Sequence, residues 1–490
     1  MPLRLFALLL FLTGLARILP AQAPYTEKKF AWSVEKDLVY GVAVNDLGQP
    51  DTLTLDLYKP LNADTARPVL VLVHGGAWVG GCKENMAWLC EEMAARGYVT
   101  ATVNYRKGWH KDDYVPNPIN PGIFPGGNCL YAADSTEIIR AIYRGAQDVK
   151  GAIRWLKARV YADSSCNHAV LVGGESAGGF VALTTALLDR PEEKPAACAA
   201  LPDAPVPGAN LSNCYTVDCI NKEFTVTADA RKRPDLGPVE GTMNPNGFDA
   251  RVMGVLSFYG ALPVQALPDN WIQGPDTPAL YLYHQTCDGV VPFGYGNPYF
   301  VISNYCNLGF TPWHYTTPHM FGNGAIAEFL KSLPHPPPYL TDFLPCPAFD
   351  PNLALFECLR YNDNGSYHYT HNLPERAAKI AAFFSPLVAA RLGSPPCLVS
   401  TAAPAWAAGL RLAPNPFREA PVLYCDTPPG EPVYGSLSDS QGRLVWQGRE
   451  DLQAGANTMN WPVGGLSAGL YFLRLAGQEG AMVWRVVRQR

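Results

Sequence analysis

One serine in this sequence has surroundings that would suit a nucleophile. Ser176 stands in the stretch "VLVGGESAGGF", residues 170–180, between two pairs of glycines and directly after a run of strand-like residues. A serine hydroxyl attacks a carbonyl carbon only when a neighbouring base removes its proton. The hydroxyl must also stand clear of the backbone, and the G-x-S-x-G pattern from Gly174 to Gly178 is typical of a strand-to-helix turn that exposes it. We therefore predict that Ser176 is a nucleophile in acyl transfer.

Acyl transfer also needs hydrogen-bond donors for the oxygen that becomes negative in the transition state. The stretch "VHGGAW", residues 73–78, follows a continuous apolar run and offers backbone N–H groups on a glycine-rich loop. We assign the oxyanion hole to the N–H groups of Gly76 and Ala77, with that of Ala177 completing it. His74 precedes the serine and lies at a strand end, so we expect it to brace this loop rather than to act as the base.

The segments that must position these residues alternate between strand and helix patterns. Residues 36–44 and 51–60 are β-rich and are expected to form an antiparallel pair. The apolar run before His74 is of the kind that a strand shows when both its faces are covered. The later alternation predicts an α/β fold with a doubly wound, mostly parallel sheet over residues 24–393, in which "ALFECLRY", residues 354–361, is expected to be a strand.

Two stretches interrupt this alternation. Residues 108–131 and about 191–250 are rich in Pro, Gly, Asn and Cys, and insertions of this length inside a domain are usually lids or binding walls. The thirteen cysteines all lie after the first 25 residues, which favours disulfides in an oxidising compartment. Their odd number leaves at least one thiol free or bound to another molecule. We expect four of them to staple the insertions: Cys129, Cys198, Cys214 and Cys219.

Together, "HGGAW", "VNYR", "QDVKGAIRWL", "GGESAGG" and "TCDGVVP" resemble the α/β-hydrolase family, especially its esterases with an HGG oxyanion motif. The resemblance covers roughly residues 50–390. It implies the chain order nucleophile, acid, histidine, and Asp288 in "HQTCDGVVPF" matches the acid. His368 ends a "GSYH" segment similar to the family's G-x-G-H loop, with Tyr367 in place of a glycine. His371 is the alternative base, and His319 is a remote third.

The resemblance implies a serine carboxylesterase that acts on a small-molecule or polymer-borne ester and needs no metal or organic cofactor. Two other functions stay open. The first is a peptidase on the same fold, and the second is a non-catalytic binding protein that keeps the hydrolase scaffold. The intact set of Ser176, Asp288 and a late histidine argues against the second, because such relatives usually lose one of these residues.

The N-terminus predicts export. Residues 1–23 combine an early Arg4, an apolar run and a small-x-small site at Ala21 to Ala23, which is typical of a secretory signal peptide. No other segment is apolar enough over a sufficient length to predict a membrane span. The chain has 490 residues, a net charge of −5 and no dense basic cluster, which argues against a nucleic-acid partner.

The C-terminal part changes character. Residues 394–407 have the Pro, Ala and Ser content of a linker, and residues 408–490 contain short β-like runs separated by glycines, which predicts a small β-sandwich. "LAPNPF", "LSDSQGRLVWQG", "LSAGLYFLRL" and the closing "VWRVVRQR" resemble the sorting domain of the type IX secretion system. The resemblance implies that secretion machinery as a partner, and a protein that is secreted or attached to the cell surface after passage through the periplasm. A generic accessory β-domain is the alternative.

Overall fold

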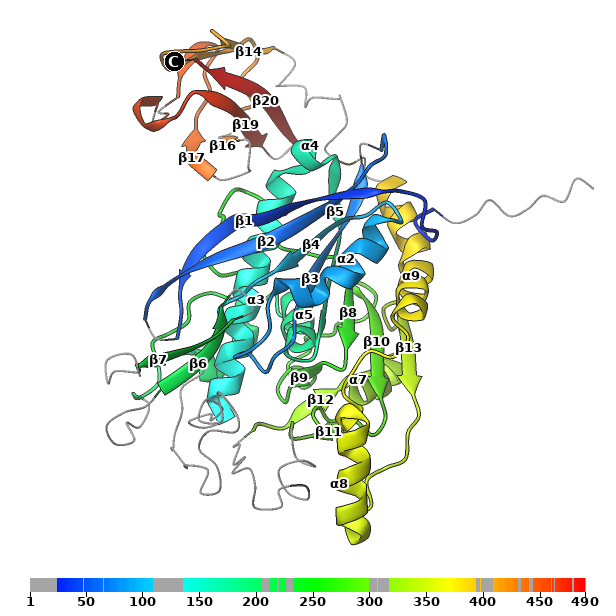
Figure 1. Ribbon diagram of the computed structural model, residues 1–490. Coiled ribbons are helices and arrows are strands. Elements are labelled where there is room, and N and C mark those ends of the chain that lie inside the picture. Colours follow the sequence, from blue (N-terminus) through cyan, green and yellow to red (C-terminus); the bar gives the residue numbers. More distant parts are fainter. Residues whose placement is uncertain are drawn as a thin grey trace, which may run out of the picture.

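The computed structural model describes most of the chain between residues 24 and 489 (Figure 1). The predicted signal peptide, residues 1–23, lies outside the described residues, as does the linker apart from Cys397. Nearly all of the first predicted insertion lies outside them too. The described ranges are 24–46, 48–64, 66–108, 135–203, 212–217, 220–225, 232–298, 306, 317–393, 397, 409–430, 433–439, 444–459, 461, 463–477 and 480–489.

Within these ranges, eight strands form one large sheet in the order β1-β2-β4-β3-β5-β8-β10-β13 (Figure 1). The first two strands form the predicted antiparallel pair, and β2 is antiparallel to β4. The remaining neighbours run parallel. The strands are β1 (Trp32–Val44), β2 (Pro50–Pro60), β3 (Arg67–Val73), β4 (Val99–Val103), β5 (Ser165–Glu175), β8 (Gly254–Phe258), β10 (Ala279–Gln285) and β13 (Tyr339–Leu344).

Helices cover both faces of this sheet, which confirms the predicted doubly wound α/β-hydrolase fold. In β3, Val69, Val71 and Val73 pack into one core with α3, α5 and α7, whereas Leu70 and Leu72 pack into the other with α2 and α9. This alternation follows from the two-residue period of a strand. The helices are α2 (Ala87–Ala94), α3 (Ser135–Ala158), α4 (Val160–Asp163), α5 (Ala177–Leu187), α7 (Asn323–Ser332), α8 (Ala354–Asp363) and α9 (Leu373–Gly393).

One predicted strand is wrong. Residues 354–361 form most of helix α8, which exposes Leu355, Phe356 and Leu359 and buries Tyr361. A short apolar run has the same appearance in a strand and in a helix, so its residue types alone do not decide between the two. The last strand of the sheet is instead β13, which pairs with β10.

Short elements surround the carboxyl ends of the parallel strands. A three-stranded sheet has the order β11-β12-β9, and β6 pairs with β7 in the second insertion. The strands are β6 (Ser212–Val217), β7 (Ile220–Thr225), β9 (Ala261–Pro263), β11 (Tyr295–Gly296) and β12 (Met320–Gly322). The 3₁₀ turns are η1 (Lys83–Met86), η2 (Pro191–Glu193), η3 (Ala196–Cys198), η5 (Pro351–Leu353), η6 (Gly365–Tyr367) and η8 (Val463–Gly465).

The C-terminal region forms two further sheets that share one apolar core, as the predicted sandwich requires. The orders are β14-β15-β18 and β17-β16-β19-β20. Asn415 and Phe417 of the "APNPF" stretch bind the last strand: the Phe417 N–H donates to Val487 O at 2.8 Å, and Asn415 Oδ1 accepts from the Val487 N–H at 3.0 Å. The strands are β14 (Leu410–Ala413), β15 (Val422–Cys425), β16 (Val433–Asp439), β17 (Leu444–Glu450), β18 (Gly455–Thr458), β19 (Gly469–Gly477) and β20 (Gly480–Arg488).

Disulfides join distant parts of the hydrolase region, and the pairs between described residues are Cys166–Cys397, Cys287–Cys346 and Cys306–Cys358. Cys82 is disulfide-bonded as well. Cys198 does not staple the second insertion as predicted, because its thiol is free and buried against α3. Cys129, Cys214 and Cys219 lie where the structure describes no side chain. Cys90 and Cys425 are also free and buried, so the prediction of at least one unpaired thiol is confirmed. Among the described residues, no helix combines the length and the apolar character needed to cross a membrane.

Candidate active site

Ser176 occupies a sharp turn between the end of β5 and the start of α5. Its φ of 52° and ψ of −126° are strained values for a residue with a side chain. The turn closes tightly, because a Cβ on Gly178 would lie 2.2 Å from the carbonyl oxygen of Val73, and one on Gly174 would lie 2.2 Å from that of Gly178. Only glycine fits at these two positions, which explains the G-x-S-x-G spacing around the serine.

The structure brings Ser176 together with His368 and Asp288, although the three lie far apart in the chain. His368 Nε2 lies 2.8 Å from Ser176 Oγ, and His368 Nδ1 lies 2.7 Å from Asp288 Oδ2. With Nδ1–H donating to the carboxylate, the unprotonated Nε2 is left to accept the serine proton. This is the geometry that a nucleophile, a base and an orienting acid require.

His368 owes its position to a strained loop after α8. Tyr367, the residue that replaces a glycine in the G-x-G-H pattern, has a φ of 54°, and Ser366 has a φ of 56°. Both values lie in the left-handed region, which a glycine would adopt without strain and other residues adopt at a cost of about 1–3 kcal/mol. The loop is held against the acid-bearing loop, since the Gly289 N–H donates to Ser366 O at 2.9 Å.

The other candidate bases lie elsewhere. The side chain of His371 is exposed, and its backbone N–H donates to the hydroxyl of Tyr283 at 2.9 Å. His319 is also exposed and stacks on Tyr295 with ring centroids 5.1 Å apart. Neither imidazole is brought to Ser176.

The Asp288 carboxylate has donors on both oxygens. Its Oδ1 accepts from the N–H groups of Val290 and Val291, at 2.8 and 2.9 Å. Its Oδ2 faces His368 and also the fully buried His284, whose Nε2 lies 3.3 Å away. Burial raises the pKa of Asp288, but the charge of His368 and the hydrogen bonds from the two histidines outweigh it, so that this pKa lies below its usual value.

His284 is a site residue that reasoning from the sequence missed. It stands four residues before Asp288 in "HQTCD", at the end of β10. Its Nε2 also lies 3.3 Å from Val291 O, whereas its buried Nδ1 has no hydrogen-bond partner among the described residues. These contacts place an N–H on Nε2, where it can donate to the Asp288 carboxylate and the Val291 carbonyl. The signal that could have drawn attention to His284 is the presence of a histidine four residues before the predicted acid.

The loop assigned to the oxyanion hole lies directly against Ser176. A Cβ on Gly75 would lie 3.1 Å from that of Ser176, and Gly76 and Ala77 have positive φ values of 113° and 51°. Ala177 is the first residue of α5, so its N–H has no acceptor within that helix. The predicted donors therefore come from two segments that meet at the serine.

His74 contacts this loop, as expected of a brace. Its Nδ1 lies 2.7 Å from Gly75 O, and its ring stacks on Tyr105 with centroids 4.7 Å apart. Burial is the main cause that lowers the pKa of His74 to about 3, so its imidazole stays neutral.

A tyrosine joins the nucleophile turn to the histidine loop. The hydroxyl of Tyr259 donates to Glu175 Oε2 at 3.1 Å and lies 3.1 Å from Thr370 Oγ1. Its ring centroid lies 4.5 Å from that of His368. Burial is the main cause that raises the pKa of Glu175. These contacts fix the imidazole between two ordered segments.

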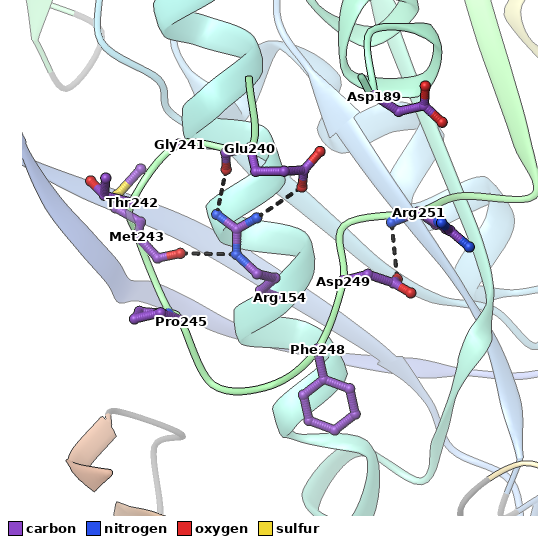
Figure 2. A pocket seen from close by; sticks show the side chains of 10 residues that line it. All are labelled: Arg154, Asp189, Glu240, Gly241, Thr242, Met243, Pro245, Phe248, Asp249 and Arg251. Carbon is purple, nitrogen blue, oxygen red and sulfur yellow. Dashed lines mark hydrogen bonds and ion pairs between the residues drawn. The ribbon is translucent and has the colours of Figure 1, made fainter. Parts of the chain in front are cut away.

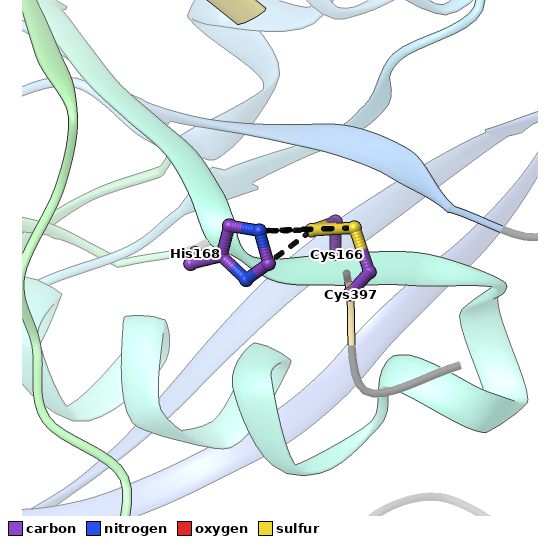
Figure 3. Close-up of side chains that lie close together, drawn as sticks. All are labelled: Cys166, His168 and Cys397. Atoms are coloured by element: carbon purple, nitrogen blue, oxygen red, sulfur yellow. Dashed lines mark hydrogen bonds between the residues drawn. A yellow bond between two sulfur atoms is a disulfide. The ribbon is translucent and has the colours of Figure 1, made fainter. Parts of the chain in front are cut away.

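A second histidine cluster, Cys166, His168 and Cys397, lies at the opposite end of β5 (Figure 3). Cys166 Sγ lies 3.5 Å from His168 Nε2, but the sulfur is bonded to Cys397. A metal ligand or a nucleophile would need the thiolate, which the disulfide removes. This cluster is therefore structural.

Comparison with known proteins gives partial matches. The BD-FAE family model matches residues 55–120. Isoprenylcysteine alpha-carbonyl methylesterase ICME of Arabidopsis thaliana is 39% identical over 77 residues, which are 16% of this chain and 16% of that protein. Neuroligin-like protein glit-1 of Caenorhabditis elegans is 32% identical over 104 residues, 19% of this chain and 13% of that protein.

The chain thus spans about a sixth of the length of the curated relatives it matches. Among solved structures, a truncated carbohydrate esterase from gut microbiota is 13% identical, covering 74% of this chain and 100% of that one, with a TM-score of 0.38. The sheet order, the helices on both its faces and the turn at Ser176 give this chain the α/β-hydrolase fold, and its local sequence matches include esterases.

Proposed function

We propose that this protein is an exported serine hydrolase that cleaves carboxylic esters through an acyl-enzyme on Ser176. The observation that carries the proposal is the unbroken hydrogen-bond chain from Ser176 Oγ through His368 to the buried carboxylate of Asp288. The strained turn at the serine and the adjoining HGG loop support it, as do the partial matches to esterases.

In the first half of the reaction, His368 Nε2 takes the proton of Ser176 Oγ while the oxygen attacks the ester carbonyl carbon. The carbonyl π electrons move to its oxygen, which becomes an oxyanion in the tetrahedral intermediate. When the intermediate collapses, the bond to the alcohol oxygen breaks and the imidazolium gives its proton to the leaving alcohol. The product on the enzyme is an acyl ester of Ser176.

In the second half, water takes the place of the alcohol. His368 removes a proton from the water as it attacks the acyl carbon, and the imidazolium then returns a proton to Ser176 as the carboxylic acid leaves. Asp288 stays ionised throughout, orients the ring through Nδ1 and stabilises the imidazolium. Its buried position and its donors on both oxygens suit this role.

The oxyanion is stabilised by the N–H groups of Gly76, Ala77 and Ala177. Each such donor contributes about 3–4 kcal/mol to transition-state stabilisation in comparable sites. The positive φ values in the loop and the brace from His74 fix the first two groups before substrate arrives. Ala177 is fixed by the start of α5.

The test is hydrolysis of p-nitrophenyl acetate by the full chain and by Ser176→Ala. We expect kcat/KM to fall by at least about 10⁴-fold, because the residual rate would come from the oxyanion hole and binding alone. Ser165→Ala is the matched control, since this buried serine begins the same strand, and we expect it to stay within about two-fold. Equal rates for wild type and Ser176→Ala would refute the proposal.

Labelling separates a hydrolase from a non-catalytic binding protein, and a comparison of substrates separates an esterase from a peptidase. An organophosphate should form a covalent adduct on Ser176 that mass spectrometry locates, whereas a non-catalytic binding protein would stay unlabelled. A peptidase would also be labelled, so we compare an amide and an ester of the same acyl group. We expect turnover of the ester and at least about 100-fold slower turnover of the amide; the reverse order would assign a peptidase.

We also propose that the chain is exported by residues 1–23 and handed to type IX machinery by residues 408–490. The support is the order of the tail motifs in the sequence and the contacts by which the "APNPF" residues bind β20. Deleting residues 408–490 should leave the hydrolase region in the periplasm, measured by cell fractionation. Normal surface export of the truncated chain would exclude a sorting role for this domain.

A further inference from the structure

Helix α3 presents basic side chains to two cavities, which differ in how those charges are neutralised. The first, of about 420 Å³, lies between the C-terminal half of α3 and the loop around residues 240–251 (Figure 2). There Arg154 pairs with Glu240 at 3.3 Å, and Lys157 pairs with Asp249 at 2.7 Å. The protein thus supplies its own counter-charges, and this cavity needs no charged ligand.

The second cavity, of about 350 Å³, lies between the N-terminal half of α3, the β1–β2 turn and residues 232–236. Its cations are Arg106, Arg140, Arg144 and Lys232, and its lining includes two aspartates. Arg106 has a carboxylate partner, Asp148, at 2.7 Å. Asp235, one of the lining aspartates, pairs with Lys194 at 2.6 Å, outside the lining.

Arg140 and Arg144 stand one turn apart on α3, and their side chains are buried without a carboxylate. Arg140 is 1% and Arg144 3% exposed. Arg140 donates to three backbone carbonyls, those of residues 197, 199 and 234, while Arg144 donates from Nη2 to Gly108 O. Within the part of the chain that the structure describes, neither guanidinium forms an ion pair, and both Nε atoms are buried without an acceptor.

Two adjacent buried cations that form no ion pair are costly, since each loses hydration and repels the other, and the buried carboxylate of Glu137 offsets only part of this for Arg140. The pKa of Arg140 is lowered, by burial first and by the charge of Arg144 second, although the charge of Glu137 acts in the opposite direction. Carbonyl oxygens satisfy donors but do not neutralise charge. An oxyanion in the cavity would supply both the missing charge and an acceptor for the unused donors of Arg144.

The cavity lies at the edge of the sheet that carries Ser176. Because β2 runs antiparallel to β4, the β1–β2 turn lies beside the carboxyl ends of the parallel strands, the edge where ligands bind in open α/β sheets. A chain of hydrogen bonds connects the two regions. Arg144 donates to Gly108 O, and the Gly108 N–H donates to Trp78 O at 2.6 Å, next to Ala77 of the oxyanion loop.

We propose that the cavity containing Arg140 and Arg144 binds an oxyanion, a carboxylate or a phosphate, carried by a molecule no larger than a single sugar unit. The volume sets the size, and the unpaired guanidinium of Arg144 is the group that recognises the charge. This site goes beyond the proposed hydrolase function and does not depend on it, because nothing in the argument uses the reactivity of Ser176.

The test is calorimetric binding to the full-length Ser176→Ala protein, so that no ligand is turned over. The probes are glucuronate, inorganic phosphate and glucose, the last being the neutral match of glucuronate in size. We expect one of the two anions to bind and glucose not to bind. Arg144→Gln should weaken anion binding at least about ten-fold, and Arg144→Lys should recover part of the loss.

Arg154→Gln is the matched control, because it removes the same charge from the same helix in the other cavity, and it should leave anion binding unchanged. If glucuronate binds and Arg144→Gln weakens its binding, the ligand belongs to the carboxylate class. If only phosphate binds in this Arg144-dependent way, the ligand belongs to the phosphate class. The proposal is overturned if neither anion binds, or if Arg144→Gln and Arg154→Gln weaken binding equally. If Arg144→Gln does not fold, a crystal of the wild-type protein soaked with the tighter-binding anion provides the test. Electron density for the anion at a place other than Arg144 would overturn the proposal.

Discussion

Strand β5 has a histidine-paired nucleophilic atom at each end, and the two pairs have opposite fates. Near its start, Cys166 Sγ lies 3.5 Å from His168 Nε2, and just beyond its end Ser176 Oγ lies 2.8 Å from His368 Nε2 (Figure 3 shows the first pair). The sulfur is closed by a disulfide, and Cys166 lacks the positive φ of Ser176. The hydroxyl is open, stands on a strained turn and has an acid behind its histidine.

Proximity of a nucleophilic residue and an imidazole therefore does not by itself make a reactive pair. His168 Nε2 approaches a backbone carbonyl, Arg391 O, at 3.2 Å, whereas His368 Nδ1 meets the buried Asp288. A carboxylate fixes the tautomer and stabilises the imidazolium, and a carbonyl does so far less. Each of the following predictions changes one feature that separates the two ends of β5.

The largest effect is expected from the histidine of the Ser176 pair. His368→Ala should lower kcat/KM for p-nitrophenyl acetate by about 10³–10⁴-fold, because no other described imidazole reaches Ser176 Oγ. His371→Ala is the control three residues away, and with its exposed side chain it should stay within about three-fold. A larger loss in His371→Ala than in His368→Ala would transfer the role of base to His371.

The disulfide of the Cys166 pair should matter for stability and not for activity. Cys397→Ser opens a bridge between residues 231 apart in sequence, and we expect the free energy of unfolding to fall by about 2–4 kcal/mol. kcat/KM should stay within about two-fold. Urea unfolding and ester hydrolysis measure the two quantities.

Cys166→Ser is the matched variant, since it breaks the same bond from the other side and should cost the same. The double variant Ser176→Ala, Cys397→Ser frees Cys166 beside His168 and should still lack esterase activity. Recovered hydrolysis there would contradict the view that an acid and a strained turn are required.

The Ser176 end of this contrast could be predicted from the sequence, whereas the Cys166 end could not. The turn at Ser176 and the HGG loop are local patterns, and both lie where the alternation of strands and helices placed them. Asp288 and His368 lie 112 and 192 residues beyond the serine. Spacing does not connect residues so distant, so the family's chain order had to supply them.

The failures have physical causes as well. The run at residues 354–361 has no period that separates helix from strand, and the pairing of cysteines depends on tertiary contacts that no spacing encodes. Tyr367 adopts a positive φ, as a glycine could at this position, so the histidine loop keeps its shape although the glycine of the family pattern is replaced. His284 was missed because its role depends on one side-chain contact across a loop.

The brace of the oxyanion loop gives the Ser176 end a pH-dependent stability. With its pKa lowered to about 3 by burial, folded His74 stays neutral, whereas in the unfolded chain it takes a proton below about pH 6.5. The unfolded state therefore binds more protons, and stability falls as pH drops from about 6.5 towards 3. We expect a loss of about 2 kcal/mol between about pH 8 and about pH 5 from this group.

Urea unfolding at the two pH values measures this loss, and His74→Gln should reduce it by about that amount. His319→Gln, which changes an exposed imidazole, is the control and should leave the loss unchanged. An identical pH dependence in His74→Gln and wild type would mean that His74 is not held neutral by the fold.

The smallest effect is expected from His284, whose Nε2 gives Asp288 Oδ2 a second donor. His284→Leu should lower kcat/KM about ten-fold, because the carboxylate loses one of the contacts that orient it. His284→Gln can still donate near the Nε2 position and should recover most of the loss. Steady-state hydrolysis of p-nitrophenyl acetate measures both.

A merely structural role for His284 would not change the pH profile. Without the donor from His284, the Asp288 carboxylate binds a proton or the neighbouring imidazolium more strongly. The acid limb of the kcat/KM profile should therefore move to higher pH in His284→Leu, and it should not move in His284→Gln. Tyr281 lies on the same strand as His284, and Tyr281→Phe removes its buried hydrogen bond to Asp342 of β13. This variant should cost stability without moving that limb. If His284→Leu leaves the pH profile of kcat/KM unchanged from wild type, His284 does not help to orient the Asp288 carboxylate.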